Sequence, residues 1–363
     1  MTFCDTMPRH ITLVEQQLYF RDSLDPDYGL QSDEYVFECG WKFLPEPALV
    51  EIYKRVADCD RLSMARTCRR WHSVFGNSEI WRHRSFRFGG LRKYRTVVWK
   101  ALKVSRAFGR HFRSMEITCD HPTRAVAGLF SHTLRKLVGV FKWKNIQLRR
   151  LSIPRLQMDR NYRNPSIKNR LSIAICRLLK MQTSLVCFDM NNAGFDALHA
   201  SQILKALTSR DDFELRELNL EDFASNRLNL YDKVYFKDAI ARLSHLSRLY
   251  INYSYVNDDV MRIITQTCGH CLEEFGVKIY RLEAHNHVIS PACWNDLKER
   301  SPNLKANIYF EGVANSSVVQ AILIPQIPVK WLQVWSGKKM YYLDWKLRDT
   351  LKYIGQNFNE TIG

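Results

Sequence analysis

The sequence predicts an α/β fold in which a short helical region precedes a series of strand–helix units. Two observations lead to this prediction. Apolar residues recur at helical spacing between residues 44 and 71, and a six-residue apolar pattern then returns eight times along the chain. The 363 residues suffice for one large domain or two ordinary ones. A composition of 46% apolar and 25% charged residues is typical of globular proteins.

The first 40 residues differ from the rest in charge. They contain eight Asp or Glu residues and two arginines, which is a net charge of −6. Because the whole chain carries +17, residues 41–363 carry +23. Residues 1–40 also show no sustained apolar period, so we expect an acidic, flexible N-terminal tail.

The stretch "LPEPALVEIYKRVADCDRLSMARTCRRW", residues 44–71, predicts two or three short helices. An apolar stripe at i, i+3, i+4 and i+7 indicates a helix that starts after Pro45. This stripe consists of Leu49, Ile52, Tyr53 and Val56. Asp60 is the expected N-cap of the next helix, and Arg61 falls on a face away from the apolar residues. Three short helices bury too little surface to be stable alone, so another element must complete their core.

The pattern apolar-x-x-apolar-x-apolar organises the rest of the chain. Its copies begin at residues 112, 148, 185, 215, 246, 272, 304 and 329, and the copy at 304 is looser than the others. The second half of each copy alternates as a short strand does. Helical segments lie between copies, at 196–207, 257–264 and 291–300. Stacked units of this kind form an irregular leucine-rich-repeat solenoid, with parallel strands inside and helices outside.

These patterns divide the chain into four predicted parts. The acidic tail is followed by a helical domain at 41–88, a repeat domain at 89–345 and a C-terminal capping helix at 346–363. The capping helix is predicted from the spacing of Leu347, Leu351, Ile354 and Phe358. Residues 120–147 fit the pattern poorly, which leaves the repeat boundaries there open.

Residues 41–88 resemble an F-box. The resemblance rests on Leu44-Pro45, the acid at Glu46, "EIY" at 51–53, "DRLSMARTCRRW" at 60–71 and the late "IW" at 80–81. Pro47 and Thr67 depart from the usual pattern, but neither removes an apolar anchor. In F-box families these helices bind the Skp adaptor, which links them to a cullin-RING ubiquitin ligase. An F-box followed by leucine-rich repeats implies a substrate receptor that holds an unidentified protein target for ubiquitination. Such a chain has no catalytic residue, metal or cofactor of its own. The alternative without this resemblance is a helical cap on the first repeat.

The resemblance also assigns roles to individual residues. Those expected to face the adaptor, or to hold the helices that do, are Leu44, Pro45, Leu49, Ile52, Leu62, Cys68 and Trp71. Ile80 and Trp81 are expected to pack the F-box onto the repeats.

A basic segment lies between Glu79 and Glu116, where eleven Lys or Arg residues occur without an acid. Such a segment is either a solvated face or a surface that attracts acidic partners or polyanions. One hypothesis is that it recruits an acidic target through Arg82, Arg84, Arg92, Lys93 and Arg95. The alternative function is a basic repeat protein that binds nucleic acid or acts as a non-ligase scaffold. No stacked-aromatic signature of an RNA-binding module accompanies the charge.

Enzyme and metal signatures are absent from the sequence. It contains no Walker A loop, G-x-G-x-x-G, G-x-S-x-G or H-E-x-x-H motif. Cys268 and Cys271, with His270 between them, lack a second ligand pair of convincing spacing, although His285 and His287 are the nearest candidates. We therefore interpret both cysteines as packed repeat residues.

The C-terminal aromatic cluster is predicted to pack the last strand against the cap rather than to bind a ligand. Its members are Trp331, Trp335, Tyr341, Tyr342 and Trp345.

No segment is predicted to enter a membrane. The chain has no apolar run near the roughly 20 residues that span a bilayer. Its first residues show neither the basic nor the apolar region of a signal peptide. We expect a cytosolic or nuclear protein.

Overall fold

The computed structural model divides the chain into two compact units, residues 1–45 and residues 46–363. It describes residues 40–89, 91–120, 122–210, 214–225, 228–281, 283, 287–312, 316–335, 352–356 and 358. The predicted acidic tail therefore lies outside the described residues, apart from Gly40. In the first unit, one turn of 3₁₀ helix, η1 (Trp41–Phe43), precedes Leu44 and Pro45.

The second unit begins with four short helices. They are α2 (Glu46–Arg55), α3 (Asp58–Ala65), α4 (Arg69–Phe75) and α5 (Ser78–Trp81). The prediction of a helix after Pro45 is correct, but the prediction that Asp60 is an N-cap is wrong. The N-cap of α3 is Ala57, so Asp60 lies within the first turn. The chain leaves the helical conformation after Ala65 and enters it again after Cys68, so the apolar residues from Leu62 to Trp71 are shared between α3 and α4.

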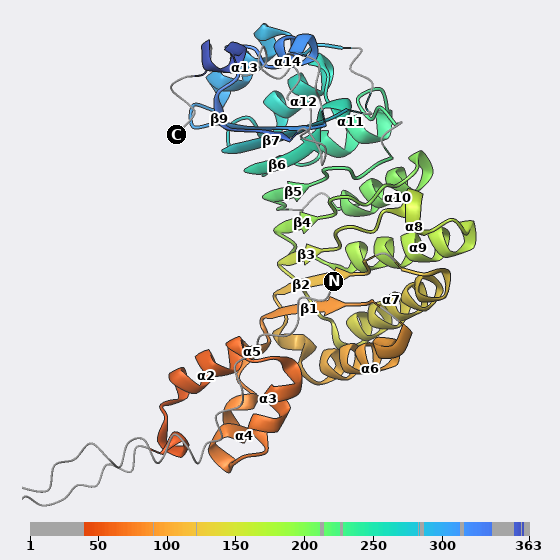
Figure 1. Ribbon diagram of the computed structural model, residues 1–363, viewed down its shortest axis with the longest axis vertical. Helices are drawn as coiled ribbons and strands as arrows, with labels where there is room; N and C mark the ends of the chain where they lie inside the picture. The colour runs from red at the N-terminus through yellow and green to blue at the C-terminus, as the bar shows by residue number, and fades with distance from the viewer. Residues whose placement is uncertain are drawn as a thin grey trace, which may run out of the picture. The chain divides into compact units, whose positions relative to one another are not determined.

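A nine-stranded sheet occupies most of the second unit (Figure 1). Every pair of neighbouring strands is parallel, and the strands lie in the order of the sequence. They are β1 (His83–Arg87), β2 (Ser114–Thr118), β3 (Arg150–Ser152), β4 (Cys187–Asp189), β5 (Glu217–Asn219), β6 (Arg248–Asn252), β7 (Glu274–Tyr280), β8 (Lys305–Glu311) and β9 (Val329–Trp335). The α/β prediction is confirmed, and a strand forms at each of the eight predicted copies of the apolar pattern.

The middle position of the pattern aligns from strand to strand. The aligned residues are Met115, Leu151, Phe188, Leu218, Leu249 and Phe275, and all of them are buried. Side chains alternate between the two faces of a strand, so this alignment builds one continuous apolar row beneath the helices.

The first strand was not predicted. β1 lies ahead of residue 89, where the repeat domain was expected to begin. Trp81, Arg84 and Phe86 nevertheless have the spacing of the pattern, and Arg84 is paired in register with Met115. Because an arginine occupies the middle apolar position, the pattern could not be recognised in this copy.

Helices follow the strands and pack in sequence order on one face of the sheet (Figure 1). They are α6 (Leu91–Phe108), α7 (Arg124–Lys144), α8 (Met158–Asn161), α9 (Pro165–Met181), α10 (Ala197–Leu207), α11 (Val234–Ala241), α12 (Asp258–Cys268), α13 (Pro291–Arg300) and α14 (Ser316–Ile322), with the 3₁₀ turns η2 (Gly109–His111) and η3 (Tyr253–Tyr255). The three helices predicted between copies are confirmed as α10, α12 and α13. Asn257 caps α12 by accepting a hydrogen bond from the Val260 amide at 3.0 Å.

Residues 120–147 fitted the pattern poorly because a helix fills most of them. α7 has 21 residues, nearly twice the length of α10.

At the C-terminal end of the chain, residues 352–356 are helical, and Ile354 and Phe358 are buried. The rest of the predicted capping helix, including Leu347 and Leu351, lies outside the described residues. Within the described part of the chain, no helix is long and apolar enough to cross a membrane.

Candidate functional site

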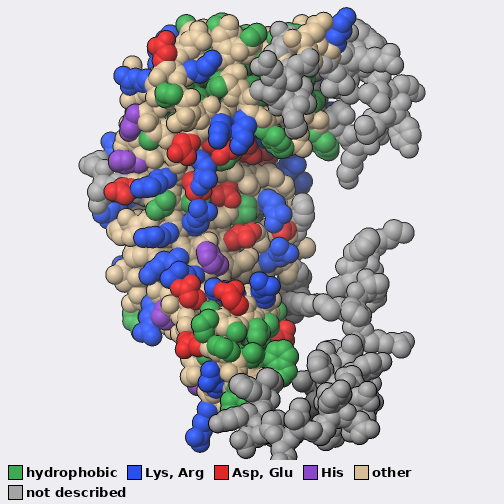
Figure 2. All heavy atoms as spheres, turned by 90° about the vertical axis from the view of Figure 1, so that its left-hand side faces the viewer, with side chains coloured by type: hydrophobic (Ala, Val, Ile, Leu, Met, Phe, Trp, Pro, Cys, Tyr) green, Lys and Arg blue, Asp and Glu red, His purple; other side chains and the backbone are tan. Residues whose placement is uncertain are grey.

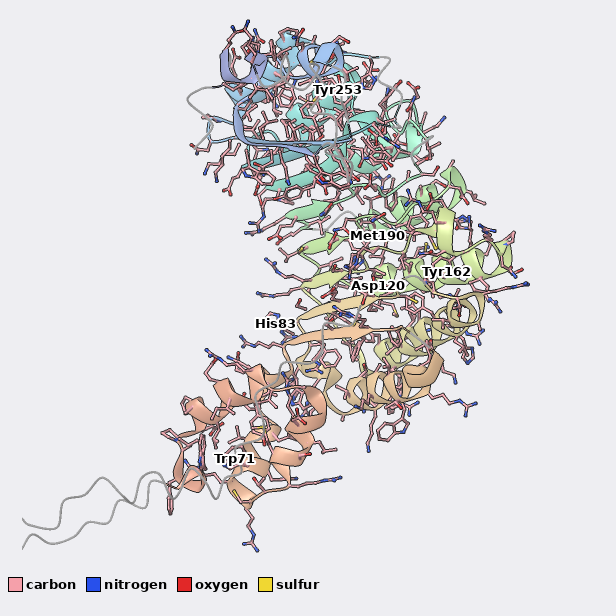
Figure 3. All side chains as sticks on the ribbon, in the orientation of Figure 1. Trp71, His83, Asp120, Tyr162, Met190 and Tyr253 are labelled. Atoms are coloured by element: carbon pink, nitrogen blue, oxygen red, sulfur yellow. The ribbon has the colours of Figure 1, made fainter. Side chains whose placement is uncertain are left out.

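An aromatic core holds the four short helices together. Tyr53 of α2 is completely buried, and its hydroxyl donates a hydrogen bond to the Trp71 carbonyl oxygen at 2.9 Å. The centre of its ring lies 6.2 Å from that of Trp71 and 6.0 Å from that of Phe75. Both partners belong to α4, so one side chain fixes α2 against α4. Figure 3 shows Trp71 within this helical end of the unit.

Arg61 was predicted to face away from the apolar residues, and that prediction is wrong. Its guanidinium is buried and donates to three carbonyl oxygens, those of Lys54 at 3.1 Å, Val56 at 3.0 Å and Ile80 at 3.2 Å. Two of these carbonyls lie at the end of α2, where a helix leaves acceptors unpaired and favours positive charge. Arg61 therefore ties the end of α2 to α5. Sequence periodicity gives no sign of this role, because it assigns only apolar residues to the interior.

The predicted adaptor residues occupy different depths in the second unit. Leu49 is completely buried, so it holds α2 in place and cannot itself touch a partner. Leu62 on α3 is 46% exposed and presents a large apolar side chain to solvent. The half-buried candidates are Ile52, Cys68 and Trp71. Figure 2 shows hydrophobic side chains gathered toward the end of the unit that α2–α5 form.

The remaining two predicted adaptor residues belong to the first unit. Leu44 is half-buried and Pro45 is exposed.

Trp81 joins the helical end to the first long helix. The indole is 2% exposed and stacks on Phe108 of α6, with the ring centres 3.9 Å apart and the planes 1° from parallel. Its Nε1 donates to the Phe75 carbonyl oxygen at 2.8 Å, and Phe75 packs edge-on against the same ring. Ile80 is also buried. These contacts complete the core that the short helices could not form alone.

The five basic residues proposed for an acidic partner do not form one described surface. Arg84 is only 6% exposed and lies 5.2 Å from the centre of the Trp81 ring, so its assignment to an exposed surface is wrong. Arg84 occupies the middle position of the apolar pattern, in register with the buried Met115, and this position explains its burial. Arg82 is exposed but pairs with Glu79, and Arg95 is exposed on α6. The side chains of Arg92 and Lys93 lie outside the described residues.

The open face of the sheet carries mixed charges. Figure 2 shows Lys and Arg side chains interspersed with Asp and Glu side chains over the strands. Glu217 of β5 accepts hydrogen bonds from Arg150 of β3 and Arg248 of β6. Farther along, the Tyr250 ring lies close to Gly276 of β7, where a Cβ atom would collide with it. This face therefore offers paired charges and a tyrosine ring rather than one dominant charge.

A polar pocket lies at the carboxyl ends of the later strands. Lys278 of β7 places its Nζ 2.5 Å from Asp222 Oδ2 and 2.6 Å from Glu311 Oε2. Burial alone would lower the pKa of Lys278, but the two carboxylates outweigh that effect and raise it. The pocket, about 220 Å³ in volume, also contains Arg160 and Tyr280.

Two glutamates beside this pocket have raised pKa values. Burial raises the pKa of Glu283 to about 7, although a hydrogen bond donated by Asn252 lowers it in part. Burial also raises the pKa of Glu221 to about 7, and the charge of Lys278 opposes the shift. The Asn252 side chain connects Glu283 to the polar pocket, because its Oδ1 also accepts a hydrogen bond from the amide of Asp222, a pocket residue, at 2.6 Å. Perturbed carboxyl groups mark candidate binding sites, and they also arise in purely structural networks.

The cysteine pair takes part in the packing of the strand–helix region. The Sγ of Cys268 donates to the Ile264 carbonyl oxygen, and the Sγ of Cys271 donates to that of Leu246. Burial raises the pKa of both thiols, and that of Cys268 reaches about 12. His287 stacks on Tyr253, which Figure 3 labels, and His285 lies outside the described residues. In the ranges that the structure describes, no three His, Cys, Asp or Glu residues are placed to hold a metal ion.

Two of the five C-terminal aromatic residues are described. Trp331 and Trp335 of β9 are 55% and 44% exposed, so much of each ring is not covered as the predicted packing of the last strand against the cap requires. Tyr341, Tyr342 and Trp345 lie outside the described residues.

Comparison with known proteins identifies the helical end. Residues 41–87 match the family model described as F-box-like, so this part of the chain is an F-box-like domain. The chain is also similar to a D-psicose 3-epimerase from Clostridium cellulolyticum H10, whose structure contains D-tagatose. The two share 11% sequence identity over 62% of this chain and 84% of the epimerase, with a TM-score of 0.22. That score is too low for the similarity to inform the fold or the function of this chain.

Proposed function

We propose that this chain is the substrate-recognition subunit of a Skp–cullin–F-box type ubiquitin ligase. The observation that carries the proposal is the F-box-like domain at residues 41–87. The domain would dock onto a Skp adaptor, and the adaptor would connect the chain to the cullin-RING scaffold. The RING subunit supplies the ligase activity, so the chain itself acts without catalytic residues, in the cytosol or the nucleus.

In this proposal the rest of the second unit is a leucine-rich-repeat solenoid that holds the target. Support comes from nine parallel strands in sequence order, with helices packed on one face. The aligned apolar row from Met115 to Phe275 is the core that stacked repeats share. The open strand face and its adjoining loops then form the target surface. The identity of the target is set by side chains there, such as Glu217 and Tyr250.

The proposed adaptor contact depends on apolar side chains at the surface of the short helices. Leu62 is the exposed candidate on α3, and Leu44 with Pro45 precedes α2. Apolar anchors at helical spacing are what a helix-in-groove interface requires. Leu49 and Trp81 are buried, so we assign them to the support of this surface.

The test is a pull-down of the purified full-length chain with purified Skp adaptor. We expect the wild-type chain to capture the adaptor and the Leu44→Ala, Pro45→Ala double variant to lose most of that capture. Leu198→Ala is the matched control, because Leu198 is an exposed leucine on α10 in the repeat region. Absence of capture by the wild-type chain would refute the proposal, as would equal capture by the double variant.

Nucleic-acid binding is the second candidate, and the charge of the outer helices favours it. The sequences of α6, α7 and α9 contain fifteen Lys or Arg residues and no Asp or Glu. Binding of this kind falls steeply with salt, because phosphate contacts release counterions. A lack of measurable affinity for RNA or DNA at low salt would eliminate this candidate.

A further inference from the structure

We propose that the groove between α6 and α7 is a docking site for an acidic amphipathic helix of a partner protein. The site is separate from both surfaces of the proposed function, because it uses neither the F-box-like helices nor the open strand face. We call it the α6–α7 groove. Its lining residues are Leu102 and Arg106 of α6, and Lys136, Gly139, Val140 and Trp143 of α7.

The groove follows successive turns of both helices, from Leu102 to Arg106 of α6 and from Lys136 to Trp143 of α7. The hollow between the two helices has a volume of about 640 Å³. A second hollow of about 580 Å³ runs along α6 beside Trp99 and Lys103, and it shares Leu102 and Arg106 with the first. Figure 1 shows the two helices packed side by side, as their contacts require. The floor is apolar, because Leu102 and Val140 form it and Gly139 contributes no side chain.

Trp143 lines the groove, and Trp99 lines the adjoining hollow along α6. Trp99 is 59% exposed and Trp143 is 69% exposed. Large aromatic side chains are enriched at protein interfaces because each buries a large apolar area. The Nζ of Lys103 lies 4.5 Å from the centre of the Trp99 ring, and that of Lys144 lies 4.1 Å from the centre of the Trp143 ring. Each indole thus presents apolar surface directly beside a cation.

The charge around the groove has one sign. Neither α6, α7 nor the neighbouring α9 has an acidic residue in its sequence. Arg106 and Lys136 line the groove, and Lys103 lines the adjoining hollow along α6. None of these three cations forms an ion pair with any residue that the structure describes. A partner that supplies carboxylates would therefore be attracted to this groove.

An apolar floor with a cationic rim fits an amphipathic helix better than it fits a nucleic acid. A helix can place apolar residues at i, i+3, i+4 and i+7 on Leu102 and Val140, with Glu or Asp along its edges. A nucleic acid would have to lay its phosphates over that apolar floor. It could also stack bases on only one face of each indole, because a lysine covers the other.

The experiment is a selection from a display library of random peptides of about 16 residues, which is long enough for a helix, on the immobilised full-length chain. We expect the selected peptides to combine Glu or Asp with Leu, Phe or Trp at helical spacing. Their affinity should fall as the salt concentration rises, because exposed charges are screened.

Gly139→Leu is the decisive variant. The position of a Cβ atom at Gly139 is open, with no other atom within 4 Å, so the leucine side chain can project into the groove. Leucine also favours a helix over glycine, so α7 should remain folded. We expect the selected peptides to lose about tenfold or more in affinity. Gly128→Ala is the control, because it makes a similar change in α7 where the new Cβ would only touch Ile167.

Two outcomes would overturn the proposal. One is a selection without acidic peptides, and the other is peptides that bind Gly139→Leu as tightly as the wild-type chain. A single-stranded oligothymidylate and anionic phosphatidylserine vesicles serve as comparison ligands. If either of these binds the wild-type groove more tightly than the peptides and is lost in Gly139→Leu, the groove serves that ligand instead. Capture of the Skp adaptor by Gly139→Leu should be unchanged, so failure here is distinguishable from failure of the proposed function.

Discussion

Two buried arginines, Arg61 and Arg84, lie near the ring of Trp81. Arg61 satisfies three carbonyl oxygens, and Arg84 lies in the core beside the Trp81 ring. A guanidinium has five donors in one plane and also packs on aromatic faces, so it can be buried where an ammonium group rarely is. The guanidinium of Arg61 donates hydrogen bonds to backbone carbonyl oxygens. Arg84 occupies a strand position at which the neighbouring strand has the apolar Met115.

Substitutions at Arg84 separate the contribution of its side-chain volume to stability from the contribution of its charge. We expect Arg84→Met to lower the free energy of unfolding by less than about 1.5 kcal/mol, since an unbranched apolar chain fills most of the same space. Arg84→Ala should lower it by about 2–4 kcal/mol, because a cavity remains. Urea denaturation measures both values. If Arg84→Met were as unstable as Arg84→Ala, the charge itself would be required.

Glu283 should make stability depend on pH. Burial raises its pKa in the folded state to about 7, above the value of 4.5 for an exposed glutamate. The folded chain therefore holds an extra proton between these values. The stabilisation associated with that proton is complete below pH 4.5 and is lost as the pH rises through 7. We expect a loss on the order of 2–3 kcal/mol from this group between pH 4.5 and 8.

The measurement is urea denaturation of the wild-type chain and of Glu283→Gln at several pH values from 5 to 8. Glutamine keeps an oxygen acceptor for Asn252 but does not ionise. The stability of the variant relative to wild type should therefore increase as the pH rises. Glu273→Gln, at an exposed glutamate, is the control and should follow the wild type. Parallel pH profiles for wild type and Glu283→Gln would contradict the expectation.

At the scale of elements, the apolar pattern predicted eight of the nine strands. It succeeded because most copies place three apolar side chains at the same spacing, and the six copies between residues 112 and 277 bury all three against the helices. It failed at β1, where Arg84 replaces the middle apolar residue. The helix that starts at Pro291 and the cap at Asn257 were also predictable, because capping chemistry is local.

Other features depend on which neighbour covers a side chain, and the sequence does not contain that information. Leu198 is exposed on α10, although Leu204 and Leu207 of the same helix are buried. Trp331 was expected to be packed against the cap and is exposed on β9. Arg61 is the opposite case, since its partners are backbone carbonyls that a composition pattern cannot show.

The junction between the F-box-like helices and α6 gives a prediction at this scale. We expect Trp81→Ala to lower the free energy of unfolding by about 3–5 kcal/mol, because Trp81 is buried and its removal leaves a large cavity. Phe108→Ala should lower it by less, because Phe108 is half-buried. The stacked rings should couple, so the double variant should be less destabilised than the sum by about 1 kcal/mol. A double-mutant cycle by urea denaturation measures the coupling. Strictly additive effects would show that the two rings contribute independently.

At the scale of the whole molecule, the second unit presents three surfaces with different chemistry. The short helices offer apolar side chains such as Leu62, and the open strand face offers paired charges. The α6–α7 groove combines Trp143 with two cations, Arg106 and Lys136, that form no ion pair within the described part of the chain. The net charge of +17 is therefore distributed over surfaces of different chemistry.

The most direct test is titration calorimetry of the Skp adaptor into the full-length chain. We predict binding at a one-to-one ratio by the wild-type chain. A triple variant with Leu44→Ala, Pro45→Ala and Leu62→Ala should weaken that binding at least about tenfold, whereas Leu198→Ala should leave it unchanged. No heat of binding with the wild-type chain, or equal affinity for the triple variant, would contradict a receptor that docks through its F-box-like domain.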